Sequence, residues 1–127
     1  MNHANQVVLG LGLATLIAAN GQPCITVGDV DGVRVAGVLL QAGEKPTPTL
    51  LRWGSEGGKY PGDAKNPGVM NDVNARVGGP DATEVQTEKM VVVNSGNVIG
   101  DNMWLWRADH TEVGWARSVP FDPLFIP

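Results

Sequence analysis

The residues most able to do chemistry form a short run near the carboxyl end of the chain. In this run Met103 and Leu105 alternate with two tryptophans, and polar residues follow. Successive side chains of a strand point to opposite sides, so the two indole rings should share one face. Flat aromatic rings beside ionisable groups suit a carbohydrate-binding surface. The candidate binding residues are Trp104, Trp106, Arg107, Asp109 and His110.

A second interpretation places both tryptophans in a core. Tryptophan is highly buried on average, so the residue type alone favours burial of Trp104 and Trp106. The sequence does not fix which side of the strand faces solvent. Both interpretations therefore stand at this point.

The carboxylates near the tryptophans do not indicate catalysis. A glycosidase needs two carboxyl groups, about 5–5.5 Å apart for retention or about 6.5–9.5 Å apart for inversion. Asp101, Asp109 and Glu112 are close in sequence, but none stands in the clearly apolar setting that marks a general acid. We predict no catalytic residue here, and we expect Asp109 to fix a turn or to pair with Arg107.

Other common sites find little support. The histidines, His3 and His110, are far apart, and no clustered Cys/His spacing exists, so we predict no metal. The run 29–32 begins like a calcium loop but lacks the later Glu, and the run 10–12 lacks the third glycine of a dinucleotide loop, so we predict no cofactor. Cys24 heads an apolar strand, which indicates a buried, inert thiol.

Composition describes the elements that must position these residues. The 127 residues allow at most one ordinary domain, with 17 glycines, 9 prolines and only 17% charged residues. Such a chain is typical of many short strands joined by tight turns. The net charge of −4, without a basic stripe, argues against a nucleic-acid partner.

Apolar segments separated by Gly, Asn, Asp and Pro predict the strands. The expected strands are 7–9, 14–17, 24–27, 33–35, 38–40, 49–53, 69–77, 90–93 and 97–110. A small-residue bend is expected at Ala36 and Gly37. The run 54–68 is the clearest loop, and loops of this length are often functional. The run 78–89 is a second polar excursion.

A weak internal repeat suggests how the strands stack. Segments that start at Val38, Val73 and Met103 can be laid over one another, with offsets of 35 and 30 residues. Repeats of this size indicate stacked units, as in a β-solenoid, although a β-sandwich explains the pattern nearly as well. The residues expected to face inward are Val35, Val38, Leu40 and Val91. Asn94 and Asn97 are expected at corners with left-handed backbone.

A family resemblance favours the solenoid. The runs 8–16, 27–37, 72–79 and 102–110 resemble coils of right-handed parallel β-helix proteins in the pectate-lyase-like superfamily. They are most similar to bacterial relatives of the exo-β-1,3-glucanases of glycoside hydrolase family 55. The fold class predicted is therefore all-β, a right-handed parallel β-helix of a few coils with long loops.

The resemblance also implies that this chain is a fragment. Family members carry many more coils, and their catalytic carboxylate lies downstream of the block that resembles residues 104–110. We predict a partial β-helix domain at 1–117 and an irregular, proline-rich tail at 118–127 without a strand. Both coil ends would then be open, which favours self-association.

The resemblance implies a function and a location. The first hypothesis is a piece of a secreted, carbohydrate-active protein with a β-glucan partner, inactive alone. The alternatives are a non-catalytic glycan-binding or structural module, and a truncated frame without function. An extracellular location is implied, but the apolar run 7–19 lacks the preceding Lys or Arg of a signal peptide and is too short for a membrane span. No membrane partner is predicted.

Overall fold

The structure is a computed structural model that describes residues 1–78, 85–108 and 122–125. Within these residues, a six-stranded and a four-stranded sheet form, and every strand pairing is parallel. The strands are β1 (Val7–Leu9), β2 (Thr15–Ala18), β3 (Ile25–Val27), β4 (Arg34–Ala42), β5 (Thr47–Trp53), β6 (Gly68–Gly78), β7 (Thr87–Val93), β8 (Val98–Asp101), β9 (Trp104–Ala108) and β10 (Asp122–Phe125).

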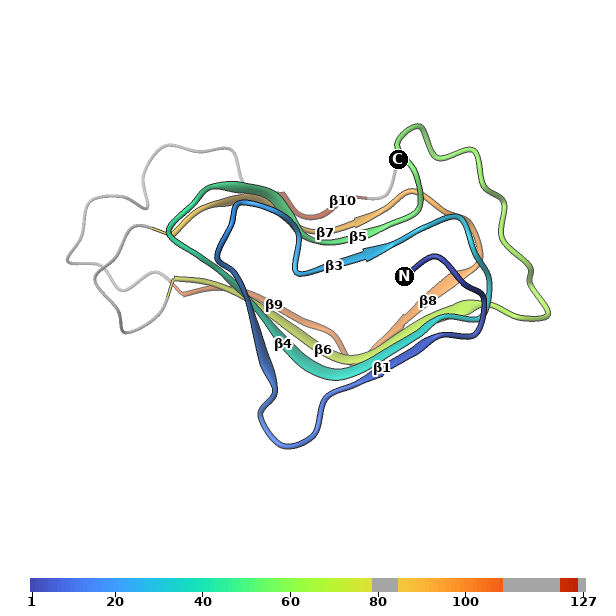
Figure 1. Cartoon of the computed structure of the whole chain (residues 1–127), viewed down its shortest axis with the longest axis horizontal. Helices are drawn as coiled ribbons and strands as arrows, with labels where there is room; N and C mark the ends of the chain where they lie inside the picture. Colours follow the sequence, from blue (N-terminus) through green and yellow to red (C-terminus); the bar gives the residue numbers. More distant parts are fainter. Residues whose placement is uncertain (79–84, 109–121, 126–127) are drawn as a thin grey trace.

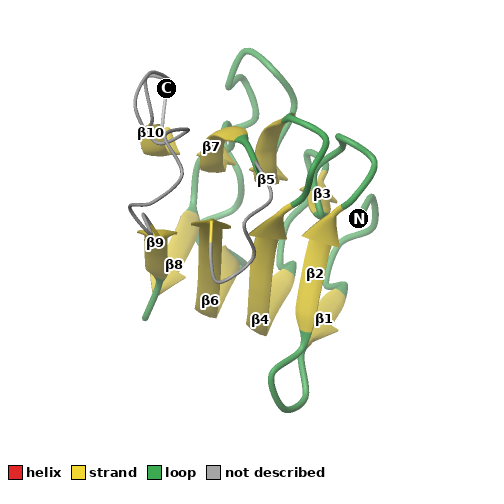
Figure 2. Cartoon of the chain, turned by 90° about the vertical axis from the view of Figure 1, so that its left-hand side faces the viewer, coloured by secondary structure: helices red, strands yellow, loops and turns green. Residues whose placement is uncertain are grey.

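The chain winds between the two sheets in successive coils. β1 and β2 lie in the larger sheet and β3 in the smaller one; β4 and β5 repeat the circuit, then β6 and β7, then β8, β9 and β10. Figure 1 shows the two sheets facing each other, and Figure 2 shows the coils side by side. Parallel pairing between successive coils confirms the predicted β-helix over the β-sandwich, because sandwich sheets are antiparallel.

The register confirms the internal repeat. Val38 pairs with Val73, and Asn74 in the next position pairs with Trp104. Each coil therefore places its residues directly beside those of its neighbours, about 4.8 Å away. Side chains that share a register position form rows across the sheet, and each row points either toward the core or outward.

The inward rows make the core between the sheets. All four residues predicted to face inward are buried: Val35, Val38, Leu40 and Val91. β-branched and leucine side chains fill these rows, as expected for a parallel sheet that is covered on one face by its partner. Among the described residues, Trp53 at the end of β5 is the largest fully buried side chain.

A left-handed residue bends the larger sheet in three successive coils. Gly37, Asp72 and Asn102 have φ values of 65°, 50° and 50° and follow register partners in β4, β6 and β8. The bend predicted at Ala36 and Gly37 is therefore confirmed. The single strand predicted over 97–110 is wrong, because the bend at Asn102 divides it into β8 and β9.

Two further expectations need correction. The predicted tail 118–127 is not free of strands, because β10 pairs in parallel with β7. Proline 123 is tolerated there since β10 pairs with no other strand and lies at the sheet edge. Of the two corner asparagines, Asn97 has the left-handed φ of 53°, whereas Asn94 does not adopt a positive φ.

The apolar run 7–19 supplies β1 and β2 in this fold. In the portion of the chain that the structure describes, no helix has the length and apolar character needed to cross a bilayer.

Candidate functional site

The two tryptophans of β9 lie on the outer face of the larger sheet. Trp104 is 63% exposed and Trp106 is 42% exposed, with ring centroids 5.9 Å apart and planes tilted by 32°. Met103 before them and Leu105 between them pack against the core. The favoured interpretation of buried tryptophans is therefore wrong, because Leu105 shares its register with the buried Ala75 and leaves the rings outside.

Polar side chains of the preceding coils lie beside the rings. Trp104 pairs in register with Asn74, and Trp106 pairs with Arg76. Arg76 pairs in turn with Gln41, and its Nη2 donates a hydrogen bond to Gln41 Oε1 over 2.5 Å. The outer surface thus combines two exposed rings with a guanidinium group and an amide from neighbouring strands.

Two polar atoms of this surface have no hydrogen-bond partner. Arg76 Nε and Asn74 Oδ1 are buried and unpaired, although a buried polar group without a partner costs about 1–3 kcal/mol. One hydrogen-bond donor, Arg76 Nε, and one acceptor, Asn74 Oδ1, therefore lack partners on the strand beside the exposed rings. Sequence reasoning missed both residues, although the repeat offsets already placed Arg76 beside Trp106 and Asn74 beside Trp104.

Arg107 does not share the aromatic face. It pairs in register with Val77, which is buried, and it follows Trp106 in the alternation of β9. Arg107 therefore lies on the side of the strand opposite the rings, where it is partly buried and has interactions of its own. The prediction that it belongs to the tryptophan surface is wrong, because a strand alternates its faces at every residue.

The remaining predicted site residues cannot be placed. Asp109 and His110 lie outside the described residues, as does Glu112. Of the carboxylates considered for catalysis, Asp101 is described, and it accepts a hydrogen bond of 2.9 Å from Asn71 Nδ2. Asp72 likewise accepts a hydrogen bond from Asn102 Nδ2. Both carboxylates thus tie neighbouring coils together at the bend.

No metal site emerges from the described part of the chain, where no group of three or more His, Cys, Asp or Glu side chains could hold an ion.

Cys24 is half-buried, and its Sγ donates to Leu16 O over 3.4 Å. Burial raises the pKa of the Cys24 thiol, which keeps it protonated at neutral pH and unreactive.

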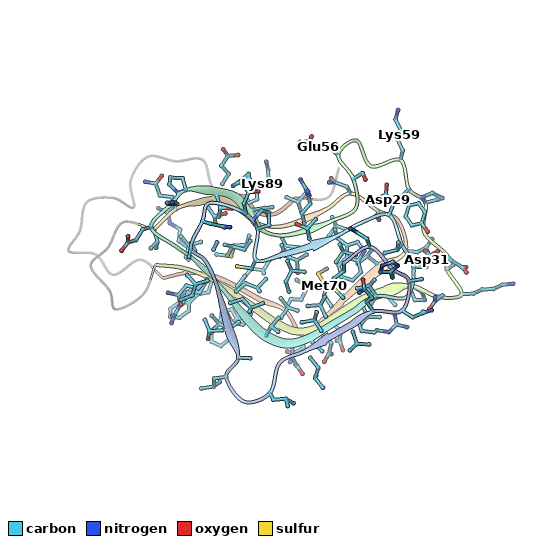
Figure 3. All side chains as sticks on the ribbon, viewed as in Figure 1. Asp29, Asp31, Glu56, Lys59, Met70 and Lys89 are labelled. Carbon is cyan, nitrogen blue, oxygen red and sulfur yellow. The ribbon has the colours of Figure 1, made fainter. Side chains whose placement is uncertain are left out.

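The long loop 54–67 is held by two aspartates of the first coil. Asp29 Oδ1 accepts a hydrogen bond of 2.8 Å from the Ser55 amide. Asp31 accepts one of 2.7 Å from the Tyr60 hydroxyl and one of 2.8 Å from the Asp63 amide. Figure 3 shows Asp29 and Asp31 at this end of the molecule, below the loop that carries Glu56 and Lys59. These carboxylates are therefore structural anchors.

We expect Asp31→Ala to release this loop. The hydrogen bond to Asp31 raises the pKa of Tyr60, so the anchored phenol contributes stability below its ordinary pKa of about 10 and loses it as the pH rises through the higher folded value. Tyr60 is the sole tyrosine, so phenolate absorbance reads its titration directly. In Asp31→Ala the titration should move down toward the ordinary value.

The matched control is Asp29→Ala, which removes the contact to Ser55 and leaves the Tyr60 hydrogen bond intact. Its titration should move down less than that of Asp31→Ala, because the Asp29 charge also raises the pKa of Tyr60 but is a smaller cause than the hydrogen bond to Asp31. Equal titration curves for the parent and Asp31→Ala would show that Asp31 does not anchor the loop through Tyr60.

The chain is similar in sequence to a known domain family and to a known exo-beta-1,3-glucanase. Residues 1–122 match the model of the LAM55 pectate lyase-like domain. An exo-beta-1,3-glucanase of Streptomyces sp. (strain SirexAA-E / ActE) is 50% identical over 120 residues, which are 93% of this chain and 19% of that protein.

Solved structures of a similar protein agree with the fold. The structure of sacteLam55A from Streptomyces sp. SirexAA-E is 48% identical, with a TM-score of 0.80 over 91% of this chain and 21% of its own. A variant of sacteLam55A in complex with glucose is 47% identical, with a TM-score of 0.82 over 91% of this chain and 20% of its own. The chain thus spans about a fifth of these relatives.

Proposed function

Because the chain belongs to the LAM55 pectate lyase-like domain family, we propose that it is part of a protein that handles β-1,3-glucan. We further propose that Trp104 and Trp106 bind glucose residues of this polysaccharide. The observation that carries the proposal is the exposure of both rings on the outer face of β9. The relative is an exo-beta-1,3-glucanase, and its name supplies the substrate class.

The chemistry of the surface suits a sugar ring. A pyranose has an apolar C–H face that lies flat on an indole ring, so each exposed tryptophan can remove such a face from water. The hydroxyl groups at the rim of the sugar need donors and acceptors. Small side-chain movements would let the unpaired Arg76 Nε and Asn74 Oδ1 supply one of each.

Binding without hydrolysis is the activity we propose for this chain alone. Cleavage needs two convergent carboxyl groups, and the described carboxylates nearest the bend, Asp72 and Asp101, hold Asn102 and Asn71 instead. This proposal coincides with the predicted glycan-binding module, and a purely structural module is the alternative. An extracellular location belongs to this proposal as well, on the ground of the family.

Calorimetric titration with laminari-oligosaccharides tests the proposal. We expect saturable binding with a Kd of about 1 mM, equivalent to ~4 kcal/mol, and no release of reducing sugar. The matched control ligands are cello-oligosaccharides, which contain the same sugar in a β-1,4 linkage, and these should bind more weakly. Absence of binding, or equal binding of both series, would contradict a β-1,3-glucan surface.

A further inference from the structure

The turn between β2 and β3 contains Asn20 followed by Gly21, the sole Asn-Gly pair in the sequence. An asparagine loses its side-chain amide spontaneously when the backbone nitrogen of the next residue attacks the side-chain carbonyl carbon. A side chain on that next residue hinders the ring closure, and glycine has no Cβ to do so. This chemistry needs only water, so its rate depends on how far the fold restrains the pair.

The fold leaves both reacting groups of this pair free to meet. Asn20 is exposed, and Gly21 has a φ of 78°. Among the described residues, none supplies a backbone acceptor to the Gly21 amide. The Gln22 amide donates a hydrogen bond of 3.0 Å to Asn20 Oδ1, which turns this side chain toward the backbone that follows it. Negative charge develops on the same oxygen during the attack, and a donor placed there stabilises the transition state.

The free Gly21 amide is a property of this turn and not of its place in the first coil. The corresponding turn of the next coil, residues 43–46, lies directly against it, since a Cβ added to Gly21 would be 3.1 Å from Pro46 O. Even so, no backbone hydrogen bond joins the two turns in the described structure. The turns at this corner therefore stack without the hydrogen-bonded ladder that ties the strands together.

The pair Asp31 and Gly32 provides a contrast within the same chain. Aspartate before glycine closes the same five-membered ring, with loss of water in place of ammonia. Here, however, the Gly32 amide donates to Asn66 O over 2.9 Å. The two carboxylate oxygens of Asp31 accept hydrogen bonds from Tyr60 and Asp63. Both reacting groups are held, so we expect the fold to protect this second pair.

We propose that Asn20 is a site of spontaneous deamidation in the folded chain. The Gly21 nitrogen gives its proton to a hydroxide ion and bonds to Asn20 Cγ. The bond from Cγ to the side-chain nitrogen then breaks, and ammonia leaves with a proton from water. One water molecule opens the resulting succinimide at either carbonyl, which gives aspartate or isoaspartate. Either product adds one negative charge to the net charge of −4, and isoaspartate also lengthens the backbone between β2 and β3 by a methylene group.

Incubation of the folded chain at mildly alkaline pH tests the proposal. Isoelectric focusing follows the added charge, and fragmentation mass spectrometry of the tryptic peptide 1–34 assigns it to a residue. We expect the acidic product to form at Asn20, and to form faster as the pH rises, because the attacking nitrogen must lose its proton. Asn20→Gln should slow its formation about 10-fold or more, equivalent to ~1.4 kcal/mol in the barrier, since glutamine must close a six-membered ring. Circular dichroism checks that this exposed substitution keeps the fold.

The chain unfolded in urea is the matched control. Unfolding frees the pair Asp31 and Gly32 from its hydrogen bonds, so isoaspartate should form at both pairs in urea, whereas the folded chain should form it at Asn20 and not at Asp31. Absence of the product from the folded chain would overturn the proposal, whatever forms in urea. An acidic product that Asn20→Gln forms as fast as the parent chain would overturn it as well, because the reaction would then occur at another residue.

Discussion

Replacement of Trp53 by alanine is expected to lower the free energy of unfolding by about 3–5 kcal/mol. Trp53 is 1% exposed and shares its register with Val27 and Val93 in the smaller sheet. Its ring reaches the larger sheet at Gly68, where an added Cβ would lie 2.4 Å from Trp53 Cζ2. The ring thus fills the space between the sheets, and truncation leaves a cavity there.

Urea denaturation followed by circular dichroism measures this loss. A domain of this size has a stability of about 5–15 kcal/mol, so the variant should be close to unfolding at moderate temperature. The matched control is Trp104→Ala, which removes an exposed ring of the same type and should change stability by no more than about 0.5 kcal/mol. Equal losses in the two variants would contradict the assignment of Trp53 to the core and Trp104 to the surface.

The second large effect concerns glucan binding. The double variant Trp104→Ala, Trp106→Ala should weaken the binding of laminari-oligosaccharides about 100-fold, since a loss of ~1.4 kcal/mol per ring is tenfold in Kd. The reason is that each ring supplies the apolar surface on which a sugar ring can lie. Each single variant should lose about 10-fold, because the rings are adjacent but separately exposed.

Ile99→Ala is the matched control for the tryptophan variants. Ile99 is an exposed apolar residue on the outer face of the same sheet, but it is not aromatic. Its replacement should leave the Kd unchanged. Binding that survives the loss of both rings would place the glucan elsewhere on the molecule.

The repeats indicated stacked units but fitted a β-sandwich nearly as well, and the family resemblance decided in favour of the coil architecture that the parallel pairing confirms. The alternation around Val35, Val38 and Leu40 marked the inward positions, and the offsets of 35 and 30 residues matched the pairing of β4, β6 and β9. Neighbouring coils in a β-helix pair in register, so similar segments come to lie side by side. Small and corner-forming residues such as Gly37 and Asn97 marked backbone that must become left-handed.

The composition of the site could not be predicted in the same way. Average burial placed Trp104 in the core, whereas the register of Leu105 with Ala75 decides that the ring faces out. We grouped Arg107 with the tryptophans because it follows Trp106 in the sequence. Successive residues of a strand point to opposite faces, so Arg107 lies on the other side of β9. Arg76 joins the surface from another coil, 30 residues earlier than Trp106, and only the pairing of β6 with β9 brings the two residues together.

Contacts between coils also determine two features that we did not predict, namely the division between β8 and β9 and the formation of β10. Asn102 adopts left-handed backbone in line with Asp72 of the preceding coil, to which its side chain donates a hydrogen bond, and this alignment divides β8 from β9. The segment of β10 contains a proline and has no clear alternation, yet it pairs with β7. The alternation of apolar and polar residues along a segment therefore says little about a strand that forms because a neighbouring strand pairs with it.

Quenching of tryptophan fluorescence tests the central claim most directly, namely that Trp104 and Trp106 form an exposed glucan surface. The measurement uses a Trp115→Phe variant, in which Trp53 remains as a buried internal reference. We predict red-shifted emission that a soluble quencher reduces, and protection from the quencher on titration with laminari-oligosaccharides but not with cello-oligosaccharides. Blue emission insensitive to the quencher, or exposed tryptophans that the glucan does not protect, would contradict the account.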